Sequence, residues 1–65
     1  HLELTIFDAQ GRVIKHLIDE KRYPGKNSIK WNADDNYGQK VSSGIYFFVM
    51  KVGEHQKTNK LLYIK

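Results

Sequence analysis

The sequence predicts an all-β fold, and three of its features lead to this prediction. Apolar and polar residues alternate with a period of two in several short segments, as in strands that bury one face. Turn-forming residues separate these segments at short spacing. The 65 residues suffice for one domain only, residues 1–65, and a domain of this size has a small core. We therefore expect about five antiparallel strands arranged as a β-sandwich or a barrel.

The first predicted strand and its turn lie at the start of the chain. In residues 2–7, the apolar Leu4 and Ile6 alternate with polar neighbours, which is typical of a half-buried strand. Asp8 follows, and its carboxylate can accept hydrogen bonds from nearby amides. Gly11 can adopt a positive φ. These residues predict a turn that leads into a second strand.

The second strand is expected at residues 13–18, where apolar residues on both sides leave its inward face open. A helix over residues 12–22 is the alternative, because apolar residues recur there at a spacing of four. The short distance between turn signals favours the strand. Pro24 and Gly25 form the clearest turn signal of the sequence.

Three further strands are expected, at residues 28–32, 45–52 and 56–64, with a tight hairpin joining the last two. We assign the Tyr46 face of the second of these strands to the core. Its opposite face, with Ile45 and Phe47, is also apolar and requires a cover, either the parent protein or a partner. The predicted core consists of Leu4, Ile6, Ile29, Trp31, Tyr46, Phe48 and Met50.

The loop ahead of the long apolar strand raises the question of a calcium site. The Asp-x-Asn-x-Gly spacing at residues 34–38 matches the start of a calcium loop, but the bidentate Glu that should follow is missing. We interpret the segment as turn chemistry, with Asp34 and Asp35 accepting backbone amides and Gly38 at positive φ. Gly44 is expected to allow the backbone to approach a neighbouring segment closely.

The charged and polar residues predict neither catalysis nor a metal or cofactor site. The formal net charge is +4, but the basic residues are spread along the chain, so a nucleic-acid-binding surface is not expected. His1, His16 and His55 have no ligand spacing, and the sequence contains no cysteine. No apolar run approaches the roughly 20 residues that span a bilayer, so direct membrane insertion is not expected.

Exposed aromatic residues leave carbohydrate binding open as a function. Tyr23 and Tyr37 lie in predicted loops, and Trp31 would complete a platform for sugar rings. Because Trp31 shares a face with Ile29 in an alternating segment, its burial in the core is the favoured interpretation.

Several short motifs, in this order, resemble the immunoglobulin-like module shared by the flagellar hook-capping protein FlgD and the C-terminal sorting domains of type IX secretion cargo. The motif residues are Gly11, Arg12, Pro24, Gly25, Asp34, Asp35, Gly38, Gly44, Tyr46, and the tail Lys60, Leu61, Leu62, Tyr63, Ile64 and Lys65. The resemblance covers essentially the whole chain. Many sorting domains have Pro where this chain has Ser42, and one or two strands that usually come first are absent.

The resemblance implies an immunoglobulin-like antiparallel β-sandwich, truncated at its start, within a larger secreted protein. It implies a non-catalytic sorting and anchoring domain whose tail is recognised by the outer-membrane type IX machinery. The protein would be secreted or held on the surface of a Gram-negative bacterium, via the periplasm. The alternative is a structural accessory module, of the hook-cap type or packed on the catalytic domain of a secreted enzyme. A missing strand would leave a sheet edge at which a second copy could pair to form a homodimer.

Overall fold

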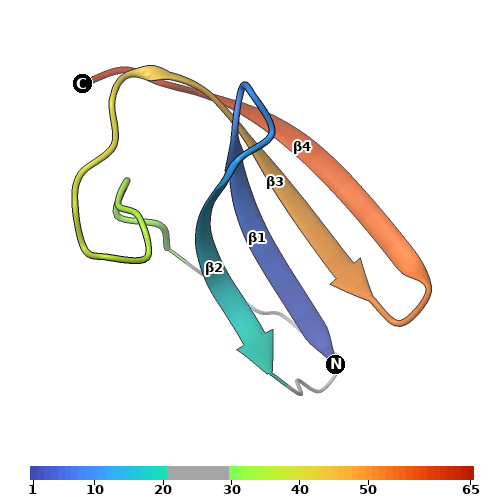
Figure 1. Cartoon of the computed structure of the whole chain (residues 1–65). Helices are drawn as coiled ribbons and strands as arrows, with labels where there is room; N and C mark the ends of the chain where they lie inside the picture. Colours follow the sequence, from blue (N-terminus) through green and yellow to red (C-terminus); the bar gives the residue numbers. More distant parts are fainter. Residues whose placement is uncertain (21–29) are drawn as a thin grey trace.

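The computed structural model describes residues 1–20 and 30–65, and these contain four strands: β1 (Leu2–Asp8), β2 (Val13–Glu20), β3 (Gly44–Val52) and β4 (His55–Tyr63). The strands form one antiparallel sheet in the order β2-β1-β3-β4 (Figure 1). The all-β class is therefore confirmed, and the helix alternative is wrong where β2 replaces it. Within the described residues, no helix is long and apolar enough to cross a membrane.

The sheet consists of two hairpins, β1–β2 and β3–β4, and the pairing of β1 with β3 joins them. The β3–β4 hairpin has a two-residue loop, in which Gly53 has a φ of 59°. From Gly44↔Tyr63 to Val52↔His55 its register runs without a shift. The β1–β2 pairing contains two shifts, after Leu4 and after Ile6. The β2 side of the sheet is therefore irregular and the β4 side is regular.

The strand expected at residues 28–32 is not formed by its described part, because residues 30–32 belong to no strand. Residues 28 and 29 lie outside the described residues. Trp31 Nε1 donates a hydrogen bond of 2.9 Å to the Asp34 carbonyl, and Ala33 has a φ of 55°, so the chain turns here. Among the described residues, the loop of residues 30–43 therefore covers the sheet where a second sheet was expected.

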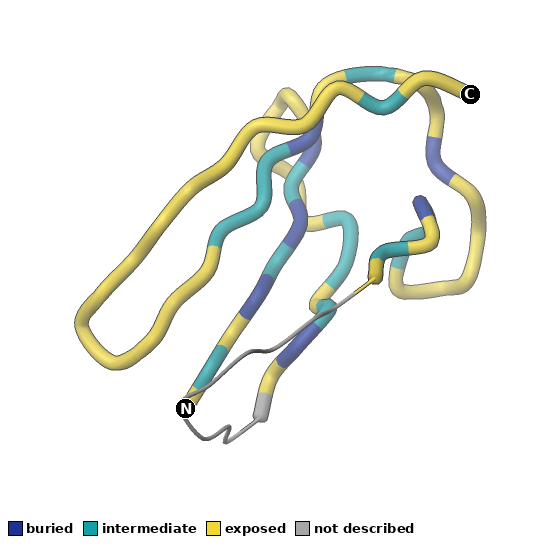
Figure 2. The backbone as a smooth tube through the Cα atoms, turned by 180° about the vertical axis from the view of Figure 1, so that it is seen from behind, coloured by how far each residue is buried: buried dark blue, intermediate teal, exposed yellow. Residues whose placement is uncertain are grey.

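The core lies between this loop and one face of the sheet. Ile6, on the central strand, is fully buried, and Ala33, Val41 and Tyr46 form one cluster with it. Leu4 and Ile18 are also buried. Figure 2 shows buried positions along β1 and at the start of β3, whereas the far end of the β3–β4 hairpin is exposed.

Trp31 joins the loop to the sheet through aromatic contacts. Its ring packs edge-on against Tyr46 at 5.4 Å and against Phe48 at 5.7 Å between centroids, and it is tilted against Tyr63 at 6.2 Å. Such pairs add stability beyond the burial of their area. Trp31 and Phe48 are half-buried and pack on the cluster. The loop is thus held to the β3–β4 side of the core by one indole ring.

Two residues of the expected core require comment. Met50 is 36% exposed, so its assignment to the core is wrong. Its side chain is on the same face as Tyr46. However, Met50 lies near the β3–β4 turn, whereas Val41 and Ala33 pack on the opposite end of the sheet, around Tyr46. Ile29 lies outside the described residues.

We predict that Trp31→Ala lowers the free energy of unfolding by about 3 kcal/mol, the lower end of the range for such truncations, because the indole is half-buried. Urea unfolding followed by far-UV circular dichroism measures the change. Tyr37→Ala is the matched control, since Tyr37 is 89% exposed and its loss should change stability by less than about 0.5 kcal/mol. Equal effects of the two substitutions would contradict the anchoring role of Trp31.

Candidate binding site

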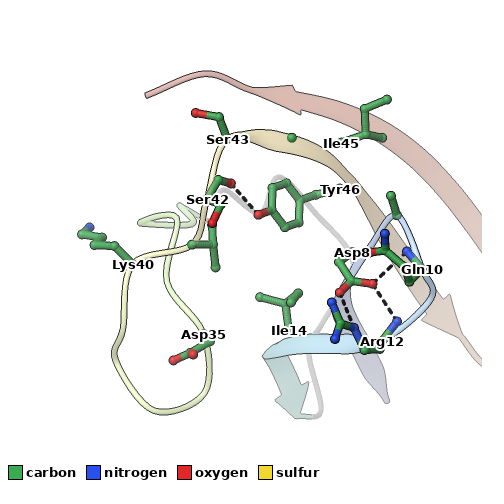
Figure 3. A pocket seen from close by; sticks show the side chains of 13 residues that line it. Asp8, Gln10, Arg12, Ile14, Asp35, Lys40, Ser42, Ser43, Ile45 and Tyr46 are labelled. Carbon is green, nitrogen blue, oxygen red and sulfur yellow. Dashed lines mark hydrogen bonds and ion pairs between the residues drawn. The ribbon is translucent and has the colours of Figure 1, made fainter.

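A pocket of about 410 Å³ lies between the β1–β2 turn and the segment that leads into β3 (Figure 3). It brings together four residues of the sequence motifs: Arg12, Asp35, Gly44 and Tyr46. Lys40, Ser42 and Ser43 add polar groups from the same side. Motifs that are distant in the sequence therefore meet at this pocket.

The β1–β2 side of the pocket is a turn organised by Asp8. Asp8 Oδ1 accepts hydrogen bonds from the backbone amides of Gln10 (3.0 Å) and Arg12 (2.9 Å). Its Oδ2 accepts one from Arg12 Nε at 2.8 Å. The Arg12 amide, with help from the guanidinium, holds the pKa of Asp8 below its ordinary value despite the opposing effect of burial. The carboxylate is therefore ionised and fully engaged in shaping the turn.

Gly11 completes this turn with a φ of 86°, as expected, and Gly38 has a φ of 81° in the following loop. Gly44 was expected to allow a close approach of the backbone to a neighbouring segment. This expectation is wrong, because a Cβ at position 44 would have no atom within 4 Å. No close approach of the backbone therefore requires a glycine there. Pro24 and Gly25 lie outside the described residues.

On the opposite side, residues 33–41 form a compact loop. The backbones of Asp34 and Lys40 form an isolated antiparallel β-bridge. The Val41 amide donates a hydrogen bond of 2.9 Å to the Ala33 carbonyl. Asp35 Oδ1 accepts the amides of Tyr37 and Gln39, each at 2.9 Å. The turn interpretation is supported for Asp35, whereas the expectation that Asp34 also accepts a backbone amide is wrong, because Asp34 Oδ1 accepts from Lys15 Nζ.

Two contacts fasten this loop to β2. Asp34 Oδ1 accepts a hydrogen bond from Lys15 Nζ at 2.9 Å, which lowers the pKa of Asp34. Asn36 donates its amide to the Ile14 carbonyl and accepts the His16 amide on Oδ1, both at 3.0 Å. No sequence pattern indicates this role of Asn36, because it depends on a strand 20 residues away.

Tyr46 and the residues before it close the pocket from the β3 side, and the tail lies outside it. The Tyr46 hydroxyl donates to the Ser42 carbonyl, and Ser43 Oγ accepts the Lys65 amide at 2.9 Å. Of the tail, Lys60 to Tyr63 belong to β4, whereas Ile64 and Lys65 follow it. Leu62 and Ile64 are 63% and 74% exposed. The structure therefore spreads the tail along an edge and does not gather it in the pocket.

Outside the pocket, the structure brings together His1, Glu3 and Asp19, whose possible ligand atoms lie within 4.8 Å of one another. Sequence spacing did not reveal this cluster, since it arises from the antiparallel pairing of Glu3 with Asp19. His1 Nε2 contacts Asp19 Oδ1, and both side chains are more than half exposed. An ordinary pair of exposed polar side chains explains why these groups lie close together.

The groups expected to form a carbohydrate platform are not placed together in the described residues. Tyr37 is highly exposed in the loop, whereas Trp31 packs on the core. Tyr23 lies outside the described residues. Tyr46 is the one aromatic side chain among the described residues that line the pocket, and it is buried. The pocket is a polar hollow rather than a stacking surface.

A family model described as FlgD Ig-like domain matches residues 1–56, which include β1, β2, β3 and the start of β4. Comparison with curated proteins and with solved structures gave no significant match.

We predict that the chain loses stability as the pH falls below about 4, near the ordinary pKa of Asp. The pKa values of Asp8 and Asp34 are lowered in the folded state, so their contribution is complete above the ordinary value and disappears as pH falls through the lowered values. Asp34→Asn should reduce stability at pH 7, and its difference from the parent should shrink toward pH 2. Urea unfolding at a series of pH values measures this.

Glu54→Gln is the control, because Glu54 lies exposed in the β3–β4 turn. It should follow the parent at every pH. A difference between Asp34→Asn and the parent that stays constant from pH 7 to pH 2 would contradict a contribution from the ionised carboxylate.

Proposed function

Because the chain belongs to the FlgD Ig-like domain family, we propose that it is a non-catalytic structural module of the hook-cap type. It packs against a neighbouring domain or subunit through the face of the sheet that lies opposite the core. The observation that carries this proposal is the apolar character of that face.

We call this surface the outer face, and it consists of Phe7, Val13, Ile45, Phe47, Val49 and Leu62. These residues alternate along each strand with core residues such as Ile6, Tyr46 and Phe48, so they point to the other side of the sheet. The register places Val13 beside Phe7, Phe7 beside Phe47, and Ile45 beside Leu62. The apolar side chains thus form one continuous surface across all four strands.

Much of this surface is open to solvent. Val13, Ile45 and Leu62 are 47%, 40% and 63% exposed, and the two Phe residues and Val49 are half-buried. A solvated antiparallel sheet face normally carries polar residues. A contiguous apolar surface of this kind marks a site of interaction with another protein.

The outer face also contains a hollow of about 230 Å³ that is suited to a partner's side chain. Phe7, Val13 and the buried Ile18 contribute its apolar lining, whereas Glu3, Asp19 and Lys51 contribute charged groups. An apolar centre with charged groups around it is the usual anatomy of a protein interface.

The pocket beside the β1–β2 turn supports the non-catalytic part of the proposal. Asp8, Asp34 and Asp35 each accept hydrogen bonds that shape the backbone or tie the loop to β2. Ser43 Oγ accepts a backbone amide. A general base or a nucleophile needs an adjacent proton partner aimed at a substrate, and these groups are directed at the protein instead.

The sorting function is the second candidate, and it rests on the sequence resemblance together with the exposure of Leu62 and Ile64 in the tail. The family match ends at residue 56, before the tail begins, so it supports the structural module more directly. Sorting, anchoring and a location at the cell surface are therefore proposals that depend on the tail alone.

We predict that replacing Ile45 and Leu62 together by Thr lowers binding of a hydrophobic dye such as ANS about twofold, because part of the exposed apolar surface is removed. The free energy of unfolding should change by less than about 0.5 kcal/mol, since Thr suits strands and neither side chain is in the core. Leu4→Thr, in the core, is the control and should destabilise the chain. A large loss of stability in the double variant would show that the outer face is already packed.

A reporter fusion separates the two functions. The chain is fused behind a reporter in a bacterium with a type IX system, with or without residues 60–65. If the chain is a structural module, the reporter should stay in the periplasm with and without residues 60–65. Surface display that requires residues 60–65 would instead support sorting. A variant that keeps the tail but carries Leu62→Thr tests whether one exposed side chain is recognised.

A further inference from the structure

The two edges of the sheet differ in how far they can accept another strand. The outer edge of β2 is already occupied in the first half of the strand, where Asn36 bonds the Ile14 carbonyl and the His16 amide. Two register shifts also disturb β2, and a bulged edge is a poor template for strand pairing. The β2 edge is therefore closed by the loop and by its own irregularity.

The β4 edge has the opposite character. It is the other outer strand of the sheet (Figure 1), and it pairs with β3 over nine residues without a bulge. Every residue from His55 to Leu62 is exposed (Figure 2). In the described part of the chain, no hydrogen bond from another segment reaches these residues apart from the β3 ladder. The strand contains no proline, so its outward amides and carbonyls form a complete row.

The side chains of β4 indicate the charge of the segment that would fit there. The strand carries Lys57 and Lys60 and no acidic residue. Lys57 lies opposite Met50 and Lys60 opposite Phe47, so one lysine stands on each face of the sheet beside an apolar neighbour. Opposite charges directly across two strands stabilise their pairing, and like charges oppose it.

Leu61 and Leu62 add apolar contacts at the other end of the strand. They are 39% and 63% exposed and lie on opposite faces of the sheet, opposite Tyr46 and Ile45. An added strand would therefore meet apolar side chains at this end and lysines in the middle. Main-chain bonds would supply affinity, and these alternate side chains would supply selectivity.

We propose that the outer edge of β4 binds an extended, acidic segment of a partner protein by strand addition. A second copy of this chain is a poor occupant, because its β4 brings two more lysines and no carboxylate to the pairing. The edge shares Leu62 with the outer face, but strand addition uses the outward backbone groups and the lysines of β4, so the proposal goes beyond the packing function and is tested independently of it.

The experiment uses a fluorescent octapeptide of valine with two glutamates three residues apart, so that one glutamate can face each lysine; it is titrated into the 65-residue chain and followed by anisotropy. A peptide with lysine in place of glutamate has the same length and strand propensity and serves as its counterpart. The acidic peptide should bind at least about tenfold more tightly, and added salt should weaken it. Bound peptide should slow amide hydrogen exchange in β4 and not in β2.

A charge-reversal variant tests the named side chains. Lys57→Glu with Lys60→Glu should weaken binding of the acidic peptide about tenfold and improve binding of the basic one. Lys30→Glu with Lys40→Glu changes the net charge equally, away from the edge, and should change either affinity by less than about twofold. Circular dichroism of both variants confirms the fold.

Three results would overturn the proposal. The first is equal binding of the two peptides, and the second is an equal loss in the two charge-reversal variants, which would mean attraction to net charge alone. The third is a concentration-dependent dimer of the chain without peptide, measured by light scattering, which would make a second copy the occupant.

Discussion

The contact of Trp31 with Tyr46 and Phe48 is the interaction on which the rest of this structure depends. A four-stranded sheet exposes two faces, and it needs a second layer before it can bury a core. In the described residues that second layer is a loop, which has no strand ladder to hold it in place. The indole ring, the Lys15–Asp34 pair and the two bonds of Asn36 take over this role.

Once the loop is fastened to one side of the sheet, the molecule becomes asymmetric in two respects. One face is packed and the other remains apolar and solvated, which supports its use as a packing surface. One edge is closed by Asn36 and the other is left straight and basic. The chain belongs to the FlgD Ig-like domain family, and the two contacts proposed above use these two open surfaces.

The aspartates beside the turns form hydrogen bonds that shape the loops. Asp8, Asp34 and Asp35 all lie next to turns, and each is directed at backbone amides or a lysine. Hydrogen bonds to the ionised form lower the pKa of Asp8 and Asp34, so these groups remain charged at neutral pH. A short chain without cysteines uses these bonds to define loops that a larger core would otherwise hold.

The sequence by itself determined the two hairpins, the turn at Asp8 and Gly11, and the presence of apolar residues on both faces of β3. These features follow from alternation and turn chemistry, which act between near neighbours along the chain. Only the tertiary structure decided that residues 30–32 form no strand, that Met50 is exposed, and that Asn36 closes the β2 edge. Each of these depends on where a loop crosses a distant strand, and local pattern carries no information about that crossing. The meeting of Arg12 and Tyr46 in one pocket belongs to the same class, because the packing of the loop, rather than any spacing in the chain, brings their segments together.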